Sequence, residues 1–435
     1  MKKVLSTVAA LGLVAGLAST AGAVEFKMSG HYMVEGAYVS DAAGTGLDLT
    51  EPAGADNASD AYWLHTFEIK PTMKVNDKIS MMANIRLADD TFWGNQANGD
   101  LQQNASNMGG DVSVWHLYMD YSSPIGKMRF GRVPGGAYGT AFRDADGRGD
   151  RVMLWPSFLA DGPWSTLFYI QKNTDNFQVA TGESDTDSDT YVARLYYKTD
   201  NLDSGIHYGY TNNMTNLTRA DSKNELTAYG KYKMDNVFVN AELTHFFGEV
   251  DYDAAATLDP DYDSWAGMIQ VGAKFDALTP SLMYFYSQGD DNSADDELNA
   301  ASSSGTGDLF EPLYILTGRH TGMLNNDLFS GHTATLGNSG VHAVVAAADY
   351  AVSKELTLHG AIGWAKADEV SVANTLQDDE YGWEYNVGAA YKLLDNLTYE
   401  AHFGYLDTGD YFNGNTTVDT TNNIYLMTHS LTMTF

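Results

Sequence analysis

The sequence predicts an all-β protein, a transmembrane antiparallel up-and-down β-barrel. Three observations predict this fold class: the final strand alternates apolar and hydroxyl side chains, the N-terminus has the features of an export leader, and no later apolar run reaches the ~20 residues of a spanning helix. A membrane protein without such helices must be a closed barrel, because only helices and barrels satisfy their backbone hydrogen bonds in lipid.

The stretch from Ile424 to Phe435 alternates by side-chain type. Tyr425, Met427, Leu431, Met433 and Phe435 share one parity, which His429 interrupts, and Thr and Ser residues share the other. Successive strand side chains point to opposite faces, so one face is apolar and the other is rich in hydroxyl groups. Transmembrane barrel strands have this pattern over about 9 to 11 tilted residues. A strand of a soluble sandwich is the alternative, but such a strand rarely ends on its apolar face at the final residue.

The first residues have the pattern of a secretory signal peptide. Lys2 and Lys3 supply positive charge, Val4 to Leu17 is apolar, and Ala21-Gly22-Ala23 is a small-residue cleavage site. We therefore expect a signal peptide over residues 1–23 and a barrel domain over residues 24–435. An N-terminal anchor helix is the weaker alternative, because the apolar run is shorter than the ~20 residues that span a bilayer.

The composition excludes several classes of protein. The chain has 57 acidic and 25 basic residues, a net charge of -32, which argues against nucleic-acid binding and predicts solvated acidic loops. It has no cysteine, so disulfides, thiolate metal sites and covalent haem attachment are all excluded. The 27 Tyr, 18 Phe and 8 Trp residues and only 9 prolines favour strands with aromatic side chains at the membrane interfaces.

Earlier segments show the same two-residue period as the final strand. They run from Glu25 to Val39, Trp63 to Val75, Ile79 to Leu87, Trp115 to Tyr121, Lys127 to Arg132, Leu226 to Lys233, Trp265 to Phe275 and Trp383 to Tyr391. The count over the chain is about 18 strands, with about 16 as the alternative, and an even number leaves both termini on the short-turn side. The segments near Phe177 and Val341 are the least regular.

A weak repeat marks the turns. Asp-Asn stands directly before an apolar residue at Asp175, Asp200, Asp235 and Asp395, and the last three follow the Tyr-Lys pairs that end at Lys198, Lys233 and Lys392. Asp and Asn are tight-turn residues, so each site predicts a short turn between two strands. The segments Asp251 to Asp263 and Asp290 to Ser339 predict long acidic loops at the other rim, the asymmetry of outer-membrane barrels. A soluble propeller also has repeated hairpins but lacks a consistent lipid-like face.

The run from Trp115 to Phe142, WHLYMDYSSPIGKMRFGRVPGGAYGTAF, resembles the Gram-negative porin pattern of a strand, a short turn and a strand that ends in Gly-Arg. The terminal Phe435 resembles the C-terminal signature of outer-membrane barrels. In porins the next segment is a long third loop that folds into the barrel, and the matching positions here are Gly131-Arg132 followed by Val133 to Pro163. The resemblance implies short periplasmic turns, long extracellular loops and, from general porins, a homotrimer.

The charges of this region predict a pore constriction. Arginines alternate with aspartates over a short span, and opposed charges across a narrow aqueous passage rank solutes by charge and dipole. The candidate pore-constriction residues are Arg129, Arg132, Arg143, Asp144, Asp146, Arg148, Asp150 and Arg151. A surface loop with paired charges is the alternative. Alternation places Arg132 with Met128 and Phe130 toward lipid, unless the strand has ended or Gly131 marks a bulge. Three further basic residues have the polar parity of their strands, and we expect them to add to a basic wall of the channel: Arg86, Arg194 and Lys231.

Other motifs predict no catalytic or metal site. Asp185, Asp187 and Asp189 start like a Ca²⁺ loop, but Thr190 and Tyr196 occupy the positions of its Gly and Glu. Acidic residues 290–291 and 295–297 are either a divalent-cation site or a solvated loop. The histidines form no ligand motif, and no hydrolase or nucleotide-binding signature has a suitable context.

The apolar stretch from Asp308 to Phe329 lies within an otherwise acidic loop. It predicts a plug or lid in the mouth, a patch for a neighbouring subunit, or an extra pair of short strands.

The sequence therefore predicts an outer-membrane porin of a Gram-negative bacterium, a water-filled channel for passive diffusion of small hydrophilic solutes and ions. We expect no catalytic step, no cofactor and no nucleic acid, and contact with outer-membrane lipid. Acidic vestibules favour cations and an arginine-rich constriction favours anions, so the charge pattern leaves net selectivity and the substrate open. The alternatives are a barrel that sheathes a partner electron-transfer or export complex, and an outer-membrane barrel hydrolase.

Overall fold

The computed structural model describes the body of the chain in segments. These are residues 24–40, 42–43, 46–47, 59–93, 112–135, 138–143, 148–175, 186–216, 219–252, 259–290, 292, 296–299, 310–318, 339–370, 372, 377–413 and 422–435. The expected signal peptide over residues 1–23 and Phe177, where the sequence alternation is least regular, lie outside these segments. Within the described segments no helix is long and apolar enough to cross a membrane.

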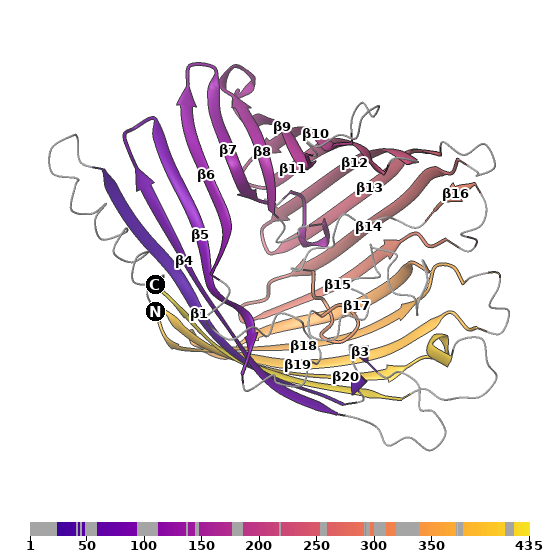
Figure 1. Cartoon of the computed structure of the whole chain (residues 1–435). Coiled ribbons are helices and arrows are strands. Elements are labelled where there is room, and N and C mark those ends of the chain that lie inside the picture. Colours follow the sequence, from indigo (N-terminus) through magenta and orange to yellow (C-terminus); the bar gives the residue numbers. More distant parts are fainter. Residues whose placement is uncertain are drawn as a thin grey trace.

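Eighteen antiparallel strands of the described residues form one closed barrel (Figure 1). They are β1 (Glu25–Val39), β4 (Asp60–Lys74), β5 (Ile79–Phe92), β6 (Ser113–Ser123), β7 (Gly126–Pro134), β8 (Arg148–Pro156), β9 (Trp164–Thr174), β10 (Ser188–Lys198), β11 (Leu202–Asn216), β12 (Arg219–Met234), β13 (Val237–Tyr252), β14 (Asp261–Ala273), β15 (Leu278–Ser287), β17 (Val341–Ala351), β18 (Leu356–Lys366), β19 (Glu380–Leu394), β20 (Leu397–Thr408) and β21 (Ile424–Thr434). The predicted fold class and the count of 18 are confirmed.

The barrel closes where the first strand meets the last. β1 pairs with β21 from His31↔Thr434 to Val39↔Leu426, and with β4 on its other side. The two termini consequently lie side by side in Figure 1. Phe435 continues the pairing, since its amide and carbonyl both hydrogen-bond to the backbone of Gly30. The alternating final strand is therefore the seam of the barrel.

Strand alternation separates an outward apolar face from an inward face. In β21 the large side chains of Tyr425, Met427, Leu431 and Met433 are exposed, and Leu426 and Thr428 are buried. The same alternation recurs around the barrel, and the outward side chains of Val152, Ile206, Leu243 and Leu282 are all exposed. Lipid-facing strands require this pattern, because lipid- and lumen-facing residues alternate in transmembrane barrels.

Short turns lie at one end of the barrel and mostly longer connections at the other. The Asp-Asn turns at Asp200, Asp235 and Asp395 join β10 to β11, β12 to β13 and β19 to β20, as predicted. The fourth prediction is wrong. Asp175 begins the connection over residues 175–187, between β9 and β10, at the long-connection end. Asp and Asn favour turns of any length, so the dipeptide alone does not determine at which end of the barrel a connection lies.

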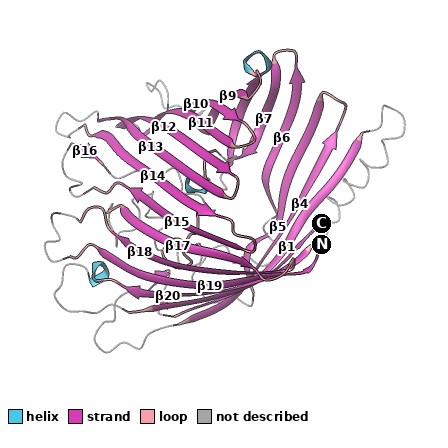
Figure 2. Ribbon diagram, turned by 180° about the vertical axis from the view of Figure 1, so that it is seen from behind, coloured by secondary structure: helices cyan, strands magenta, loops and turns pink. Residues whose placement is uncertain are grey.

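The segment expected as a single loop from Val133 to Pro163 is corrected by the structure. It contains β8, which pairs with β7 and β9, and the 3-10 turn η2 (Ser157–Leu159). The connection between β7 and β8 covers only residues 135–147 and includes the 3-10 turn η1 (Ala141–Arg143). Figure 2 shows this turn within the ring of strands. The sequence did not predict β8 as a strand, because its charged residues Arg148, Asp150 and Arg151 are typical of a loop.

The inside of the barrel has an apolar side. Residues 310–318, the described part of the apolar stretch, pack there with buried Phe310, Leu313, Ile315 and Leu316. A side chain at Gly363 of β18 would collide with Leu313, so the glycine leaves room for this segment. Of the three readings of this stretch, a plug inside the barrel fits its described part.

Four short elements complete the description. β2 (Ala42–Ala43) pairs with β3 (Gly46–Leu47), and β16 (Glu297–Leu298) pairs in parallel with the start of β14. The 3-10 turn η3 (Asp410–Asn413) buries Tyr411 and Phe412 beside Tyr381.

Candidate functional site

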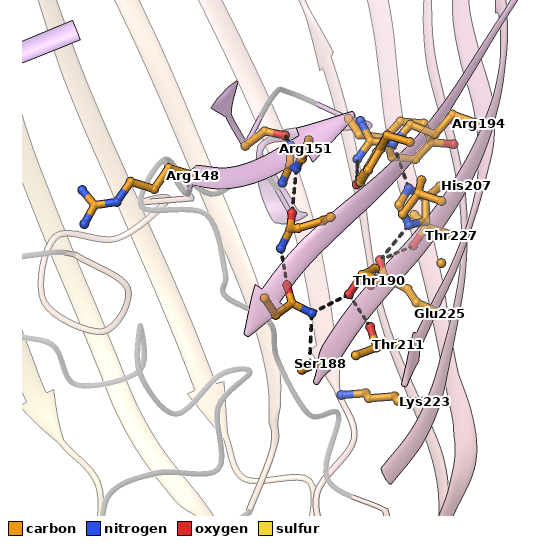
Figure 3. Close-up of a pocket in the computed structure, with 17 residues that line it drawn as sticks. Arg148, Arg151, Ser188, Thr190, Arg194, His207, Thr211, Lys223, Glu225 and Thr227 are labelled. Atoms are coloured by element: carbon orange, nitrogen blue, oxygen red, sulfur yellow. Dashed lines mark hydrogen bonds and ion pairs between the residues drawn. The ribbon is translucent and has the colours of Figure 1, made fainter. Parts of the chain in front are cut away.

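The inward face of β8 to β12 lines a polar cavity of about 540 Å³, which we call the arginine cavity. Its lining residues are Gly135, Tyr138, Arg148, Arg151, Tyr169, Gln171, Asn173, Ser188, Thr190, Val192, Arg194, His207, Gly209, Thr211, Lys223, Glu225 and Thr227. Figure 3 shows Arg151, Arg194 and His207 gathered at one end, Lys223 at the other, and Arg148 pointing aside.

Arg151 is fixed by backbone and side-chain acceptors. Its Nε donates to Gln171 Oε1 at 2.6 Å, and its Nη1 donates to the carbonyls of Pro134 and Gly135 at 3.2 and 2.9 Å. Gln171 is the cross-strand partner of Arg151 and in turn donates to Asn173. Because all these acceptors are neutral, the positive charge of Arg151 is held in place without being cancelled.

Arg194, on β10, lies next to Arg151 of β8. Its Nε donates to His207 Nδ1 at 2.9 Å, and its guanidinium carbon lies 4.6 Å from the ring centroid of Tyr138 and 5.4 Å from that of Tyr169. The guanidinium of Arg151 also lies over Tyr169, at 4.8 Å. Aromatic faces stabilise cations through their quadrupole, so the tyrosines hold the two guanidinium groups close together despite their repulsion.

Arg148 is held at the edge of the cavity by an indole. Its guanidinium carbon lies 3.8 Å from the Trp115 ring centroid, and that of Arg86 lies 3.7 Å from the same centroid. Both distances are near van der Waals contact, so the two cations occupy opposite faces of the ring. Neither an ion pair nor a hydrogen bond to Arg148 occurs among the described residues.

The connection between β7 and β8 crosses the inside of the barrel to β12 and β13. Glu242 accepts hydrogen bonds from the Thr140 amide and hydroxyl at 2.5 and 2.8 Å, and Lys231 Nζ donates to the Gly139 carbonyl at 2.8 Å. Gly139 has φ +83°, and a side chain there would collide with Glu242. Tyr138 packs against Tyr196, His207 and Tyr229, and this burial raises the pKa of its hydroxyl. We call residues 138–142 the in-folded segment.

Comparison with known proteins assigns the family. A family model described as a porin subfamily matches residues 164–433. The chain belongs to this porin subfamily. The porin resides in the outer membrane of a Gram-negative bacterium, and its barrel is a water-filled channel for passive diffusion of small hydrophilic solutes and ions. No curated protein matches the sequence.

Solved structures share the fold of the porin at low identity. OpdQ of Pseudomonas aeruginosa is 12% identical, with 94% of this chain and 97% of that chain covered and a TM-score of 0.53. A BenF-like porin from Pseudomonas fluorescens Pf-5 is 11% identical, with 94% and 99% covered and a TM-score of 0.54. OccK8 (OprE) of Pseudomonas aeruginosa is 12% identical, with 94% and 98% covered and a TM-score of 0.53. At these identities the likeness shows the fold alone.

The porin's arginine cavity is electrostatically one-sided. Its lining contains the cationic side chains of Arg148, Arg151, Arg194 and Lys223 and one carboxylate, that of Glu225. Charged side chains that line a pore set its ion preference, because they replace part of the hydration of a passing ion. The arrangement therefore attracts anions and offers guanidinium N–H donors to their oxygens.

The structure separates the predicted constriction residues. Arg148 and Arg151 line the arginine cavity, and Arg129 faces inward nearer the short turns, where it makes a two-bond ion pair with Asp120 at 2.6 and 2.9 Å. Arg132 and Asp150 are not brought into the channel: they are cross-strand partners on the outward parity and pair with each other at 2.8 and 3.0 Å. Gly131 has φ +124° but causes no register shift, so Arg132 keeps its outward parity.

Three predicted residues cannot be placed in detail. Arg143 ends η1, but its side chain lies outside the described residues, as do Asp144 and Asp146. Asp185 and Asp291 of the weighed cation sites also lie outside them. Asp187 and Asp189 are both ion-paired with Lys172, at 3.1 and 2.9 Å.

The sequence predicted that Arg194 lines the channel, and it does line the arginine cavity. The sequence analysis missed three other lining residues, Lys223, His207 and Gln171. Each has the inward parity of its strand, which is the signal that identifies it as lumen-lining. The parity could not reveal that Thr140 and Glu242, which are 102 positions apart, meet at the in-folded segment.

Proposed function

We propose that the porin preferentially passes small anionic solutes, carboxylates in particular, and selects them in the arginine cavity. One observation carries the proposal: four cationic side chains of β8, β10 and β12 face the same cavity with a single carboxylate. A carboxylate matches the planar, forked donors of arginine better than a spherical ion does.

The cavity geometry suits passage rather than retention. Arg151 and Arg194 already use part of their donors on fixed neutral acceptors, so a passing carboxylate exchanges a few hydrogen bonds at a time. Conduction requires binding strong enough for entrance and weak enough for release. The in-folded segment lies beside Arg194 through Tyr138, and Arg151 holds the start of the same connection through the carbonyls of Pro134 and Gly135. We infer that this connection narrows the path at this level.

Reversal potentials in planar bilayers test the proposal. In a KCl gradient, the double variant Arg151→Gln, Arg194→Gln should shift the reversal potential toward cation preference. A unit charge contributes about 1 kcal/mol at 4 Å in water, so each loss corresponds to roughly a fivefold change in local anion concentration.

Arg132→Gln is the matched control, because it removes one arginine charge from the outward face, and its reversal potential should equal that of the wild type. An unchanged reversal potential in the double variant would reject the arginine cavity as the selectivity site. A second test compares channel currents in sodium benzoate with those in a KCl solution supplemented with glucose and of the same bulk conductivity. Equal currents in the two solutions would reject a preference for carboxylates.

Further assignments belong to the same proposal. We infer that residues 1–23 are a signal peptide removed on export, that Arg129 and the loop charges Arg143, Asp144 and Asp146 contribute to the narrow region, and that the barrel assembles as a homotrimer. The function so described is transport without a catalytic step. Mass determination of the mature protein and of its detergent complex tests the leader and the assembly.

A further inference from the structure

The Tyr-Lys pairs of the turn repeat place two kinds of side chain at the short-turn end. Tyr232 and Tyr391 point outward and are 42% and 45% exposed, at the level where aromatic residues border the membrane. Lys233 and Lys392 follow directly and therefore have inward parity, like Lys231 and Glu384 on the same strands. The pair thus combines a membrane-interface aromatic with a lysine that faces the channel mouth.

Other strands add lysines with the same parity at the same end of the barrel. We call this set the lysine ring; it comprises Lys27, Lys74, Lys127, Lys198, Lys233, Lys274 and Lys392. These residues stand at the short-turn ends of β1, β4, β7, β10, β12, β14 and β19. By contrast, Lys172, Lys223 and Lys366 are the lysines toward the long-connection end among the described residues.

Part of the ring is neutralised by neighbouring carboxylates. Lys27 pairs with Glu25, Lys74 with Asp77, Lys127 with Asp120 and Lys198 with Asp203, at 2.8, 2.8, 3.0 and 3.3 Å. In the described part of the chain the ammonium groups of Lys233, Lys274 and Lys392 have no ion pair. Four lysines of the ring are therefore ion-paired, and the ammonium groups of the other three are not paired with a carboxylate of the described residues.

Two of these unpaired lysines share a second cavity. This space of about 610 Å³ lies at the short-turn end, and its lining includes three ammonium groups, those of Lys231, Lys233 and Lys274, and two carboxylates, those of Asp235 and Asp276. Lys231 reaches from this space to the Gly139 carbonyl, so the in-folded segment separates it from the arginine cavity. A solute that leaves the arginine cavity toward the short turns meets these ammonium groups next.

We propose that Lys233, Lys274 and Lys392 form a second anion-selecting site at the periplasmic mouth, separate from the arginine cavity. This inference rests on the proposed function, because both sites act on solutes in one channel. A charged mouth selects ions most strongly when it faces dilute salt, since the Debye length is about 30 Å at 0.01 M and about 3 Å at 1 M. The anion preference should therefore depend on the direction of a salt gradient.

The test measures reversal potentials in KCl gradients of both directions across a bilayer with oriented channels. The chain has no cysteine, so Ser157→Cys in the exposed η2 turn provides a unique thiol, and a charged thiol reagent added to one side reports the orientation. Wild-type channels should show roughly twofold higher anion-to-cation permeability when the dilute side faces the short turns. The triple variant Lys233→Gln, Lys274→Gln, Lys392→Gln should lose this difference.

The control variant Lys172→Gln, Lys366→Gln removes lysine charge from the other end and should keep the difference. Equal permeability ratios for both gradient directions in the wild type, or a difference that persists in the triple variant, would overturn the proposal. The role of the arginine cavity is tested separately. Arg151→Gln, Arg194→Gln should lower the anion preference equally for both gradient directions, and a variant without this effect would reject the arginine cavity as the selectivity site. Folding of each variant is checked by heat-modifiable migration in gels.

Discussion

Lys231 Nζ donates a hydrogen bond of 2.8 Å to the carbonyl of Gly139, 92 positions earlier in the chain. The bond ties β12 to the in-folded segment at the boundary between two cavities. Gly135 and Tyr138 line the cavity on one side and Lys231 lines the cavity on the other. One contact therefore both positions the narrow region and contributes charge to the path beyond it.

Replacing Lys231 by Met should loosen the in-folded segment and reduce anion preference together. A buried carbonyl without its donor costs about 1–3 kcal/mol, which favours alternative positions of the segment. We expect increased open-channel current noise in single-channel recordings. Lys233→Met removes the same charge two residues away without touching the segment, so it should leave the noise at the wild-type level. Equal noise in wild type and Lys231→Met would contradict the tethering role.

Glu242 anchors the same segment from β13, through the Thr140 amide and hydroxyl. Glu242→Ala removes the acceptor of both bonds, each of which involves a charged group and contributes about 1.5–3 kcal/mol. Single-channel conductance should rise, and uncharged sugars should enter proteoliposomes faster in swelling assays. Glu242→Gln keeps one acceptor oxygen and should give a smaller rise. A conductance below that of the wild type would show that the segment collapses inward instead.

Glu384 holds the apolar segment of residues 310–318 in the barrel. Its fully buried carboxylate accepts the amides of Ile315 and Leu316 at 2.8 and 2.7 Å. Glu384→Ala leaves two buried amides without that acceptor, at a cost of about 1–3 kcal/mol each. We expect displacement of the segment, faster proteolysis within it and a larger conductance. Glu400→Ala removes an inward carboxylate of β20 and serves as the control; equal effects of both variants would refute a specific role of Glu384.

Trp115 positions Arg148 without carrying charge itself. Stacking of a cation on an indole contributes about 0.5–1 kcal/mol at exposed sites. Trp115→Ala should therefore free Arg148 to move and reduce anion preference partially, by less than Arg148→Gln does. Trp115→Phe retains an aromatic face and should fall between Trp115→Ala and wild type in reversal potential. A Trp115→Ala variant with wild-type selectivity would show that the stacking does not matter for passage.

Much of the barrel could be predicted from local sequence. The two-residue alternation in Ile424–Phe435 and in Glu25–Val39 identified strands and their faces, and the turns at Asp200, Asp235 and Asp395 identified one rim. The failures were also local. Charged Arg148, Asp150 and Arg151 concealed β8, because the outward position of Asp150 carries a charge where an apolar residue was expected. Asp175 resembled the tight turns while beginning a longer connection.

The sequence by itself determined the class of the protein, a transmembrane β-barrel of about 18 strands, because the alternation of side chains and the turn residues are properties of neighbours in the chain. Only the tertiary structure decided which charges act together. Closure of the barrel brings Arg151 of β8, Arg194 of β10 and Lys223 of β12 to one cavity, and it pairs Arg132 with Asp150 on the outside. These meetings depend on strand register and on the path of the in-folded segment, which no local pattern encodes.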